Sequence, residues 1–312
     1  MKIITQRDTQ PENLRTAVTV GNFDGVHSGH SFLIKKTVDI AHSEGIASVA
    51  VTFDPHTRNV LYPQLSSTLL TTFEEKAALI ENLGVDYLLR IDFNEKFKRL
   101  GAEQFIEQIL SKQLHASDWV MGEGHSVGRD RAKGKKNLHF EAAKYHISIF
   151  TAALETVDET VISSTQIRKL INEGRVSSAV AMLGHPYLIM VERSEGLKIG
   201  TRLGYPTLNF QKPRSQKVIP PSGVYAAEAD LGGRKTKGAL YFGDCPTYRG
   251  REIHFEFHAL EFGDKEPVVG EAVNVWLHCF IRPDTAFMEE SALVNQITED
   301  INNIKKYFSQ ER

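Results

Sequence analysis

The pattern of apolar residues changes near residue 185, and this change limits the folds open to the chain more than any other feature. Before it, short apolar runs alternate with stretches of helical period. After it, strand-like runs follow one another across glycine- and proline-bearing turns, with no helical stretch until the chain end. Gly184-His185-Pro186 lies at the change, and proline cannot continue a helix. Because 312 residues suffice for two domains, we predict one domain over 1–184 and a second over 185–312.

The first half is predicted to be a doubly wound α/β domain. Its strand-like runs are nearly continuous in apolarity, which suits strands buried on both faces of a parallel sheet. They lie at 17–20, 47–53, 86–91, 119–121 and 147–154. Helices are expected between them, at 31–43, 72–84 and 101–112. The second of these carries Thr72 and Glu75 at capping-box spacing. Ligands of such sheets bind beyond the carboxyl ends of the strands.

The second half is predicted to be a β-barrel or sandwich. Its strand-like runs lie at 187–193, 223–231, 237–243, 252–262 and 272–281. In one of them Phe255 and Phe257 alternate with Glu256 and His258, so one face is apolar. A helix over about 285–308 is expected to close the chain. Its expected apolar anchors are Phe287, Leu293, Ile297 and Ile301.

Composition narrows the classes of partner. The chain is 41% apolar and 24% charged, as is ordinary for a globular protein, and its net charge of −2 supplies no global field for nucleic acid or an anionic membrane. No apolar run reaches the roughly 20 residues of a membrane span, and no secretory signal is recognisable. Cys245 and Cys279 form no CxxC and are expected to be reduced. We expect a cytoplasmic protein that binds neither nucleic acid nor a membrane. The oligomeric state stays open, and a homo-oligomer is among the alternatives.

The stretch GNFDGVHSGH, residues 21–30, follows a predicted buried strand and precedes a predicted helix. Glycines permit a tight turn there, and a helix start offers unpaired N–H groups and a positive dipole end that suit a phosphate. His27 and His30, three residues apart, share a face and could both donate to charge that develops on a transferring phosphate.

Two other interpretations of this stretch remain open at this point. It could be a capped loop with two incidental histidines. It could also hold a metal, although two histidines are too few for zinc and Asp24 is the only carboxylate close in sequence.

A second stretch, ISSTQIRKLINEG at 162–174, predicts another helix start. Ser163 and Gln166 are spaced as a capping box. Hydroxyls at Ser164 and Thr165 and the guanidinium of Arg168 would form a second phosphate grip at this start. Taken alone, the stretch could equally be an ordinary helix cap.

In the second half, residues 196–210, GLKIGTRLGYPTLNF, are rich in glycine. Such a flap can cover phosphates with its backbone amides. Thr207 and Asn209 bring oxygen atoms of the kind that Mg²⁺ accepts beside nucleotide phosphates. A plain loop leading into a strand is the alternative.

Taken together, these motifs resemble the bacterial bifunctional riboflavin kinase/FMN adenylyltransferase (FAD synthetase) family. GNFDGVHxGH paired with ISSTxIR is highly specific, and VTFDPH at 51–56 and the stretch 70–89 are also similar. The resemblance runs almost end to end and includes 196–210. It implies an N-terminal nucleotidyltransferase-type, Rossmann-like domain and a C-terminal riboflavin kinase barrel.

For the first domain, the resemblance implies adenylyl transfer from ATP to FMN, with FAD and pyrophosphate as products. His27, His30 and Arg168 would act as catalytic groups on the phosphates. Asp54 and His56 would lie on the flavin side. The implied ATP-binding residues are Gly21, Asn22, Phe23, Asp24, Ser163, Ser164 and Thr165. Positioning and electrostatics suffice for such a transfer, so no protein nucleophile is expected.

For the second domain, the resemblance implies phosphorylation of riboflavin by ATP with Mg²⁺. Glu256 would be the base that takes the proton of the terminal ribityl hydroxyl. Arg282 would contact flavin or phosphate, and Thr207 and Asn209 would hold the metal. The implied ATP-binding residues are Gly196, Lys198, Gly200, Thr207 and Asn209.

The chain departs from the family pattern at 121–134, MGEGHSVGRDRAKG. Gly124, His125 and Val127 stand where an acid or amide and two aromatic residues are usual, which weakens a stacking surface. Arg129 and Arg131 could supply replacement phosphate contacts. The departure motivates one alternative, a monofunctional riboflavin kinase with a degenerate first domain. A flavin or nucleotide sensor without turnover is a second alternative, from a non-enzyme class. A nucleotidyltransferase for another phosphate acceptor is a third.

Overall fold

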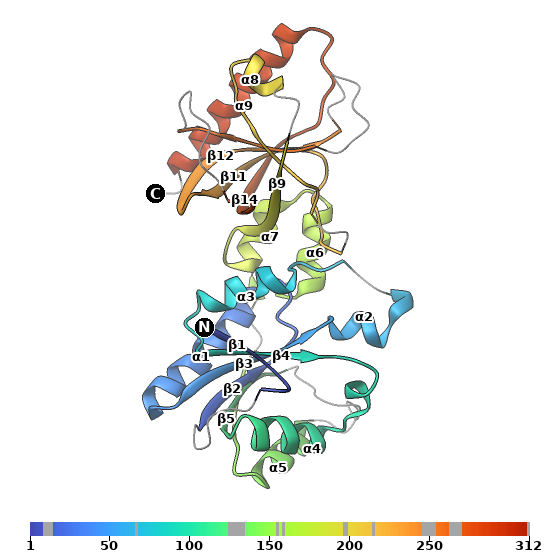
Figure 1. The fold of residues 1–312 in the computed structure, drawn as a ribbon, viewed down its shortest axis with the longest axis vertical. Coiled ribbons are helices and arrows are strands. Elements are labelled where there is room, and N and C mark those ends of the chain that lie inside the picture. The colour runs from blue at the N-terminus through green and yellow to red at the C-terminus, as the bar shows by residue number, and fades with distance from the viewer. Residues whose placement is uncertain are drawn as a thin grey trace. The chain divides into compact units, whose positions relative to one another are not determined.

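A computed structural model describes residues 1–8, 15–65, 68–123, 135–153, 156–157, 160–195, 199–213, 216–244, 254–261 and 270–310. The chain forms two compact units, residues 1–164 and 165–312, and each is described by itself (Figure 1).

The first unit is built on a parallel sheet, as predicted. Its six described strands are β1 (Lys2–Thr5), β2 (Thr16–Val20), β3 (Ala47–Asp54), β4 (Tyr87–Asp92), β5 (Ala116–Gly122) and β6 (Ser148–Ala152). They lie in the order β1-β4-β3-β2-β5-β6. The order reverses between β2 and β5, and ligands of open α/β sheets bind beyond the carboxyl ends of the strands at such a point. The sequence did not predict β1, where Ile4 alone is buried and no apolar run forms.

Helices cover both faces of this sheet. On one face α1 (Ser28–Glu44) and α3 (Phe73–Glu81) pack Ile34, Val38, Ala77 and Ile80 onto the strands. The capping box of Thr72 and Glu75 is present at the start of α3. On the other face lie α4 (Ala102–Phe105), the π-helix Ile106–Gln113 that continues it, and α5 (Lys135–Ala143), which was not predicted.

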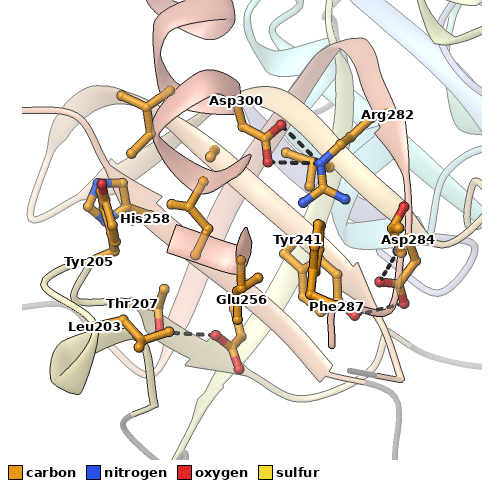
Figure 2. Close-up of a pocket in the computed structure, with 17 residues that line it drawn as sticks. Leu203, Tyr205, Thr207, Tyr241, Glu256, His258, Arg282, Asp284, Phe287 and Asp300 are labelled. Carbon is orange, nitrogen blue, oxygen red and sulfur yellow. Dashed lines mark hydrogen bonds and ion pairs between the residues drawn. The ribbon is translucent and has the colours of Figure 1, made fainter. Parts of the chain in front are cut away.

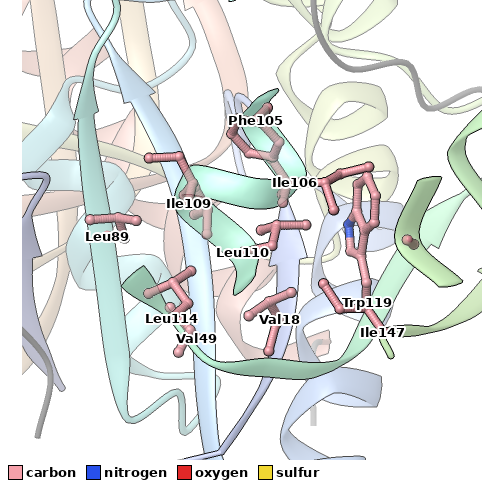
Figure 3. Packing of buried hydrophobic residues seen from close by; sticks show 14 of the residues in the cluster. Val18, Val49, Leu89, Phe105, Ile106, Ile109, Leu110, Leu114, Trp119 and Ile147 are labelled. Atoms are coloured by element: carbon pink, nitrogen blue, oxygen red, sulfur yellow. The ribbon is translucent and has the colours of Figure 1, made fainter. Parts of the chain in front are cut away.

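The core on that second face is large and apolar. Apolar side chains of the π-helix pack between those of the strands, and all of the side chains labelled in Figure 3 are buried. They are Val18, Val49, Leu89, Phe105, Ile106, Ile109, Leu110, Leu114, Trp119 and Ile147. This packing holds the carboxyl ends of β2 and β3 in place for the loops that follow them.

Short elements complete the first unit. These are α2 (Thr57–Leu61), 3₁₀ turns at Pro63–Leu65 and Phe97–Arg99, and a hairpin of β7 (Thr156–Val157) and β8 (Thr160–Val161). Helix α6 (Ser164–Asn172) begins with the last residue of this unit, and α7 (Val176–Leu183) follows it. Gly174 and Gly184 end these two helices with left-handed φ values of 73° and 76°, a conformation that favours glycine.

The second unit is a closed antiparallel barrel. In the described part of the chain its strands are β9 (Tyr187–Ser194), β10 (Leu208–Phe210), β11 (Gly223–Leu231), β12 (Arg234–Gly243), β13 (His254–Ala259) and β14 (Ala272–Pro283). Their order around the barrel is β10-β13-β12-β11-β14-β9. The predicted alternation on β13 is confirmed, since Phe255 and Phe257 are buried and Glu256 and His258 are partly exposed.

Two details of this half correct the sequence prediction. A short helix, α8 (Ile199–Arg202), lies between β9 and β10. The terminal helix α9 (Glu290–Gln310) begins five residues later than predicted, so Phe287 precedes it. Its deepest anchors are Ile301, Ile304 and Phe308, which extend the helical stripe toward the chain end and cover Val224, Ala226 and Cys279 of the barrel.

Candidate functional site

The loop between β2 and α1 is held in an unusual conformation by its own buried side chains. Phe23 and Val26 have positive φ values of 47° and 42°, and both side chains are buried under α1. A Cβ added to Gly21 would lie 2.8 Å from the Phe23 ring, so only glycine fits there. The loop therefore leaves the strand along one fixed path.

Asp24 shapes this loop from inside. Its buried Oδ1 accepts hydrogen bonds from the backbone N–H groups of Leu70 (2.9 Å) and Thr71 (3.0 Å). The Thr71 hydroxyl in turn accepts a hydrogen bond from the Gly25 N–H at 3.0 Å. These contacts join two loops at the same edge of the sheet and direct the Asp24 carboxylate into the protein.

Of the other residues predicted for this edge, Asn22 follows β2, and Asp54 and His56 lie at or just after the end of β3. The Asn22 side chain accepts a hydrogen bond from the Thr57 N–H at 3.3 Å. Asp54 forms an ion pair with Arg90. His56 caps α2, where its Nδ1 accepts a hydrogen bond from the Arg58 N–H at 3.1 Å.

His27 and His30 lie face to face at the start of α1. Their ring centroids are 3.6 Å apart with planes inclined by 18°, and Phe23 meets His30 edge-on at 5.3 Å. His27 is the N-cap, and its Nδ1 accepts a hydrogen bond from the His30 N–H at 3.4 Å. When the ring is neutral, its proton therefore lies on Nε2.

His30 is a poor site for positive charge. Burial lowers its pKa well below the usual value for histidine, and the like charges of His27 and Lys76 lower it further. At neutral pH the ring is uncharged and can donate one N–H. Its buried Nδ1 has no hydrogen-bond partner in the described part of the chain.

The second predicted motif contributes one observed contact to this loop. The Ser164 hydroxyl, at the first position of α6, donates a hydrogen bond of 2.9 Å to the main-chain carbonyl of Asp24. Ser163 directly precedes the helix. Thr165 and Arg168 belong to the second unit, where the Arg168 guanidinium donates to the Thr165 hydroxyl at 3.5 Å. That these two reach the phosphates held by His27 stays a prediction.

The second unit contains a pocket between the barrel and α9 (Figure 2). Four predicted site residues line it, namely Gly200, Thr207, Glu256 and Arg282. Asn209 lies directly across from Glu256 in the pairing of β10 with β13. Gly196 and Lys198 lie outside the described residues, as do Gly124 to Gly134 and Cys245.

One wall of the pocket is formed around the Glu256 carboxylate. The Thr207 hydroxyl donates to Glu256 Oε2 at 3.1 Å, a contact visible in Figure 2. A Cβ on Gly200 would lie 2.4 Å from the Tyr205 carbonyl oxygen and 3.2 Å from the Thr207 side chain. The backbone therefore approaches Thr207 closely. His258 Nδ1–H donates a hydrogen bond of 2.8 Å to the Pro206 carbonyl of this wall, and burial lowers the pKa of the imidazole.

The other wall holds pairs that sequence patterns did not predict. Arg282 Nε donates to both oxygens of Asp300 at 2.9 Å. The Tyr241 hydroxyl donates to Asp284 at 2.8 Å, and burial raises the pKa of that carboxyl. Asp300 is a buried acid within the apolar stripe of α9, and that interruption was the one available signal.

No group of three or more histidine, cysteine or acidic side chains is arranged to hold a metal ion among the residues that the structure describes. Within the same residues, none of the helices has both the length and the apolar character needed to span a bilayer.

Comparison with known proteins assigns a different family model to each half. The model described as FAD synthetase matches residues 9–166, and the model described as riboflavin kinase matches residues 183–308. The chain is 33% identical over 302 residues to the bifunctional riboflavin kinase/FMN adenylyltransferase of Buchnera aphidicola subsp. Schizaphis graminum, covering 95% of each. It is 31% identical over 305 residues to the protein of that name from Bacillus subtilis, covering 96% of this chain and 95% of that one.

A solved structure has the same fold over nearly the whole length. It is a crystal structure described as the macrolide-efflux protein from Streptococcus pneumoniae, with a TM-score of 0.83 and 26% sequence identity. The match covers 98% of this chain and 99% of that one.

Proposed function

The chain belongs to the bifunctional riboflavin kinase/FMN adenylyltransferase family, and from this premise we propose how its residues carry out the two reactions. The C-terminal part phosphorylates riboflavin to FMN, and the N-terminal part adenylylates FMN to FAD, each with ATP. The observation that carries this assignment is the match of two family models to the two halves of one chain. It favours two activities over a monofunctional kinase or a sensor.

In adenylyl transfer, a phosphate oxygen of FMN attacks the α-phosphorus of ATP, and the bond to the pyrophosphate oxygen breaks. His27 and His30 donate Nε2–H hydrogen bonds to the oxygens that gain charge. Their stacked arrangement and the neutral His30 ring support this role, because fixed donors need no reorganisation as charge develops. Ser164, Thr165 and Arg168 hold the β- and γ-phosphates. Gly21, Asn22, Phe23 and Asp24 keep the loop in shape, and Asp54 and His56 flank the flavin side.

In the kinase reaction, the terminal hydroxyl of riboflavin attacks the γ-phosphorus of ATP, and ADP leaves. Glu256 takes the hydroxyl proton. Its place in the pocket supports this role, since one carboxylate oxygen is held by Thr207 and the side chain stays partly exposed. Arg282, which is oriented by Asp300, contacts flavin or phosphate. Gly196, Lys198 and Gly200 cover the phosphates.

Thr207 and Asn209 are the residues that would hold Mg²⁺ in this site. The set of oxygen donors fits, because a hydroxyl and an amide oxygen lie beside a carboxylate on neighbouring strands. The metal would neutralise charge on the nucleotide phosphates. We propose that the reaction of the first unit also requires Mg²⁺, for which the triphosphate of ATP itself supplies ligands.

The functional division of the chain is proposed at residues 184 and 185. The riboflavin kinase model begins at residue 183, and α7 ends at Gly184 directly before the first barrel strand. The compact units divide earlier, after residue 164, so α7 and all of α6 but Ser164 belong to the second unit, although the motif at 162–174 is assigned to the first domain. We propose a cytoplasmic location, and a homo-oligomer remains one of the open assembly states.

Product analysis by chromatography tests the assignment directly. The protein is incubated with riboflavin, ATP and Mg²⁺, and in parallel with FMN, ATP and Mg²⁺. We expect FMN, then FAD, with ADP and pyrophosphate as by-products, and no product after chelation of the metal. Production of FMN without FAD under both oxidising and reducing conditions would support the monofunctional alternative, and tight flavin binding without ADP would support the sensor.

A further inference from the structure

Lys76 is a buried lysine on α3, within the family-like stretch 70–89, and the sequence analysis assigned it no role. It lies on α3, four residues after the cap Thr72, and its exposed fraction is 5%. Its Nζ donates a hydrogen bond of 3.1 Å to the Thr52 hydroxyl on β3. A lysine is rarely buried without a specific partner, because the ammonium loses its hydration.

The Thr52 hydroxyl passes this contact on to the loop. Its single proton is donated to the main-chain carbonyl of Asn22 at 3.2 Å, so toward Lys76 it acts as the acceptor. Asn22 precedes Phe23, whose ring meets His30 edge-on. A chain of two hydrogen bonds thus connects the ammonium to the backbone that carries the two histidines.

Four charged or titratable groups from other elements surround Lys76. Asp24 comes from the loop, Asp54 from the end of β3, Arg90 from β4 and His30 from α1. Arg90 is paired with Asp54, and His30 is neutral at pH 7. The negative charge of the buried Asp24 therefore favours the charged form of Lys76.

We propose that Lys76 is a positioning residue for adenylyl transfer, whose ammonium holds the Asn22 carbonyl through Thr52 and keeps positive charge behind His30. The inference rests on the adenylyltransferase function proposed for the first unit. The substrates bring several negative charges to the loop, and a fixed cation behind the neutral His30 donor stabilises the charge that builds up on the phosphates.

The titration of Lys76 gives the idea a measurable consequence. Burial lowers the pKa of Lys76 to about 8. The negative charges of Asp24 and Asp54 raise this pKa, and the positive charge of Arg90 lowers it further. Below that pH the ammonium is present. As the pH rises through about 8, the ammonium is lost, and the rate of FAD formation should fall with it.

The test compares wild type with K76M, K76R and a control, K35M. Lys35 is an exposed lysine on α1, which packs on the same face of the sheet as α3. FAD formation from FMN and riboflavin phosphorylation are both measured from pH 6.5 to pH 9.5, the second serving as an internal control for the second unit and for ionisation of ATP. We expect K76M to lower kcat for FAD formation by about ten- to a hundred-fold, as for loss of a hydrogen bond from a charged group, with phosphorylation unchanged. K76R should recover most of the rate and lose the decline above pH 8, and K35M should match wild type.

Two results would overturn the proposal. One is an unchanged kcat for FAD formation in K76M, and the other is a decline above pH 8 that persists in K76R. If K76M does not fold, the proposal is tested by the pH profiles of wild type and K76R and by T52V, which removes the intervening hydroxyl. Absence of FAD from the wild-type protein would instead refute the function proposed for the unit, so the two failures are distinguishable.

Discussion

The Ser164 hydroxyl donates a hydrogen bond of 2.9 Å to the main-chain carbonyl of Asp24, across 140 residues of sequence. The contact ties Ser164, the last residue of the first unit, to the loop that carries His27 and His30. Two motifs that were predicted to serve one triphosphate therefore meet at one atom pair. It also fixes the carbonyl of a residue whose side chain is already held by Leu70 and Thr71.

Removal of the Ser164 hydroxyl should weaken FAD formation moderately. We expect Ser164→Ala to lower kcat/KM for ATP by roughly two- to ten-fold, the range of a single neutral hydrogen bond. Steady-state assays with FMN in excess measure it. Ser43→Ala is the matched control, because it removes an exposed hydroxyl-to-carbonyl contact from α1. An equal loss in both variants would argue against a specific role for Ser164.

His30→Ala should separate the two activities. The variant loses one donor to the α-phosphate, so FAD formation should fall by about 10²–10³-fold, as for other donors to developing oxyanions. Riboflavin phosphorylation in the same sample should stay near wild type. Unchanged FAD output in this variant would remove the role assigned to the histidine pair.

The buried His30 should also make stability depend on pH. Its pKa is lowered in the folded state, so below pH 6.5 the unfolded chain takes up a proton that the folded chain refuses. The free energy of unfolding is then lost as the pH falls from 6.5, by about 1.4 kcal/mol per pH unit for this group. Calorimetry of His30→Gln should show a shallower loss between pH 7 and 5. The exposed His42 on the same helix is the control, and an equal effect of His42→Gln would contradict this reasoning.

Glu256→Gln should abolish most kinase turnover. The amide cannot accept the ribityl proton, so kcat should fall by about 10²–10⁴-fold. The Thr207 hydroxyl can still donate to the amide oxygen, which keeps the wall intact. FAD formation from added FMN should remain near normal, and parallel loss of both activities would contradict separate sites.

Asp300→Asn should act through Arg282. Both carboxylate oxygens accept from Arg282 Nε, and removal of the charge from a buried pair of this kind typically costs about 3–5 kcal/mol of stability. We expect a lower melting temperature for the barrel and a higher KM for riboflavin at pH 7. The neighbouring exposed Glu299 supplies the control, since Glu299→Gln should leave both unchanged. A normal KM in Asp300→Asn would show that Arg282 needs no such orientation.

Much of the first unit could be predicted because its signals are local. Continuous apolar runs and helical periods between them revealed β2 to β6, α1 and α3. Strand β1 escaped because it buries one residue at a sheet edge. In the second unit, alternation on β13 predicted its buried face, whereas the start of α9 was placed too early because Phe287 mimics the first turn of the stripe.

By itself the sequence determined the two domain types and the positions of both motifs, since periodicity, glycines and caps act over a few residues. Only the tertiary structure decided which distant groups became partners: Lys76 with Thr52, Arg282 with Asp300, and Tyr241 with Asp284. Those pairs depend on strand order and on which side chains lose water. Burial and charge compensation are properties of the whole packed unit, and no short stretch of sequence carries them.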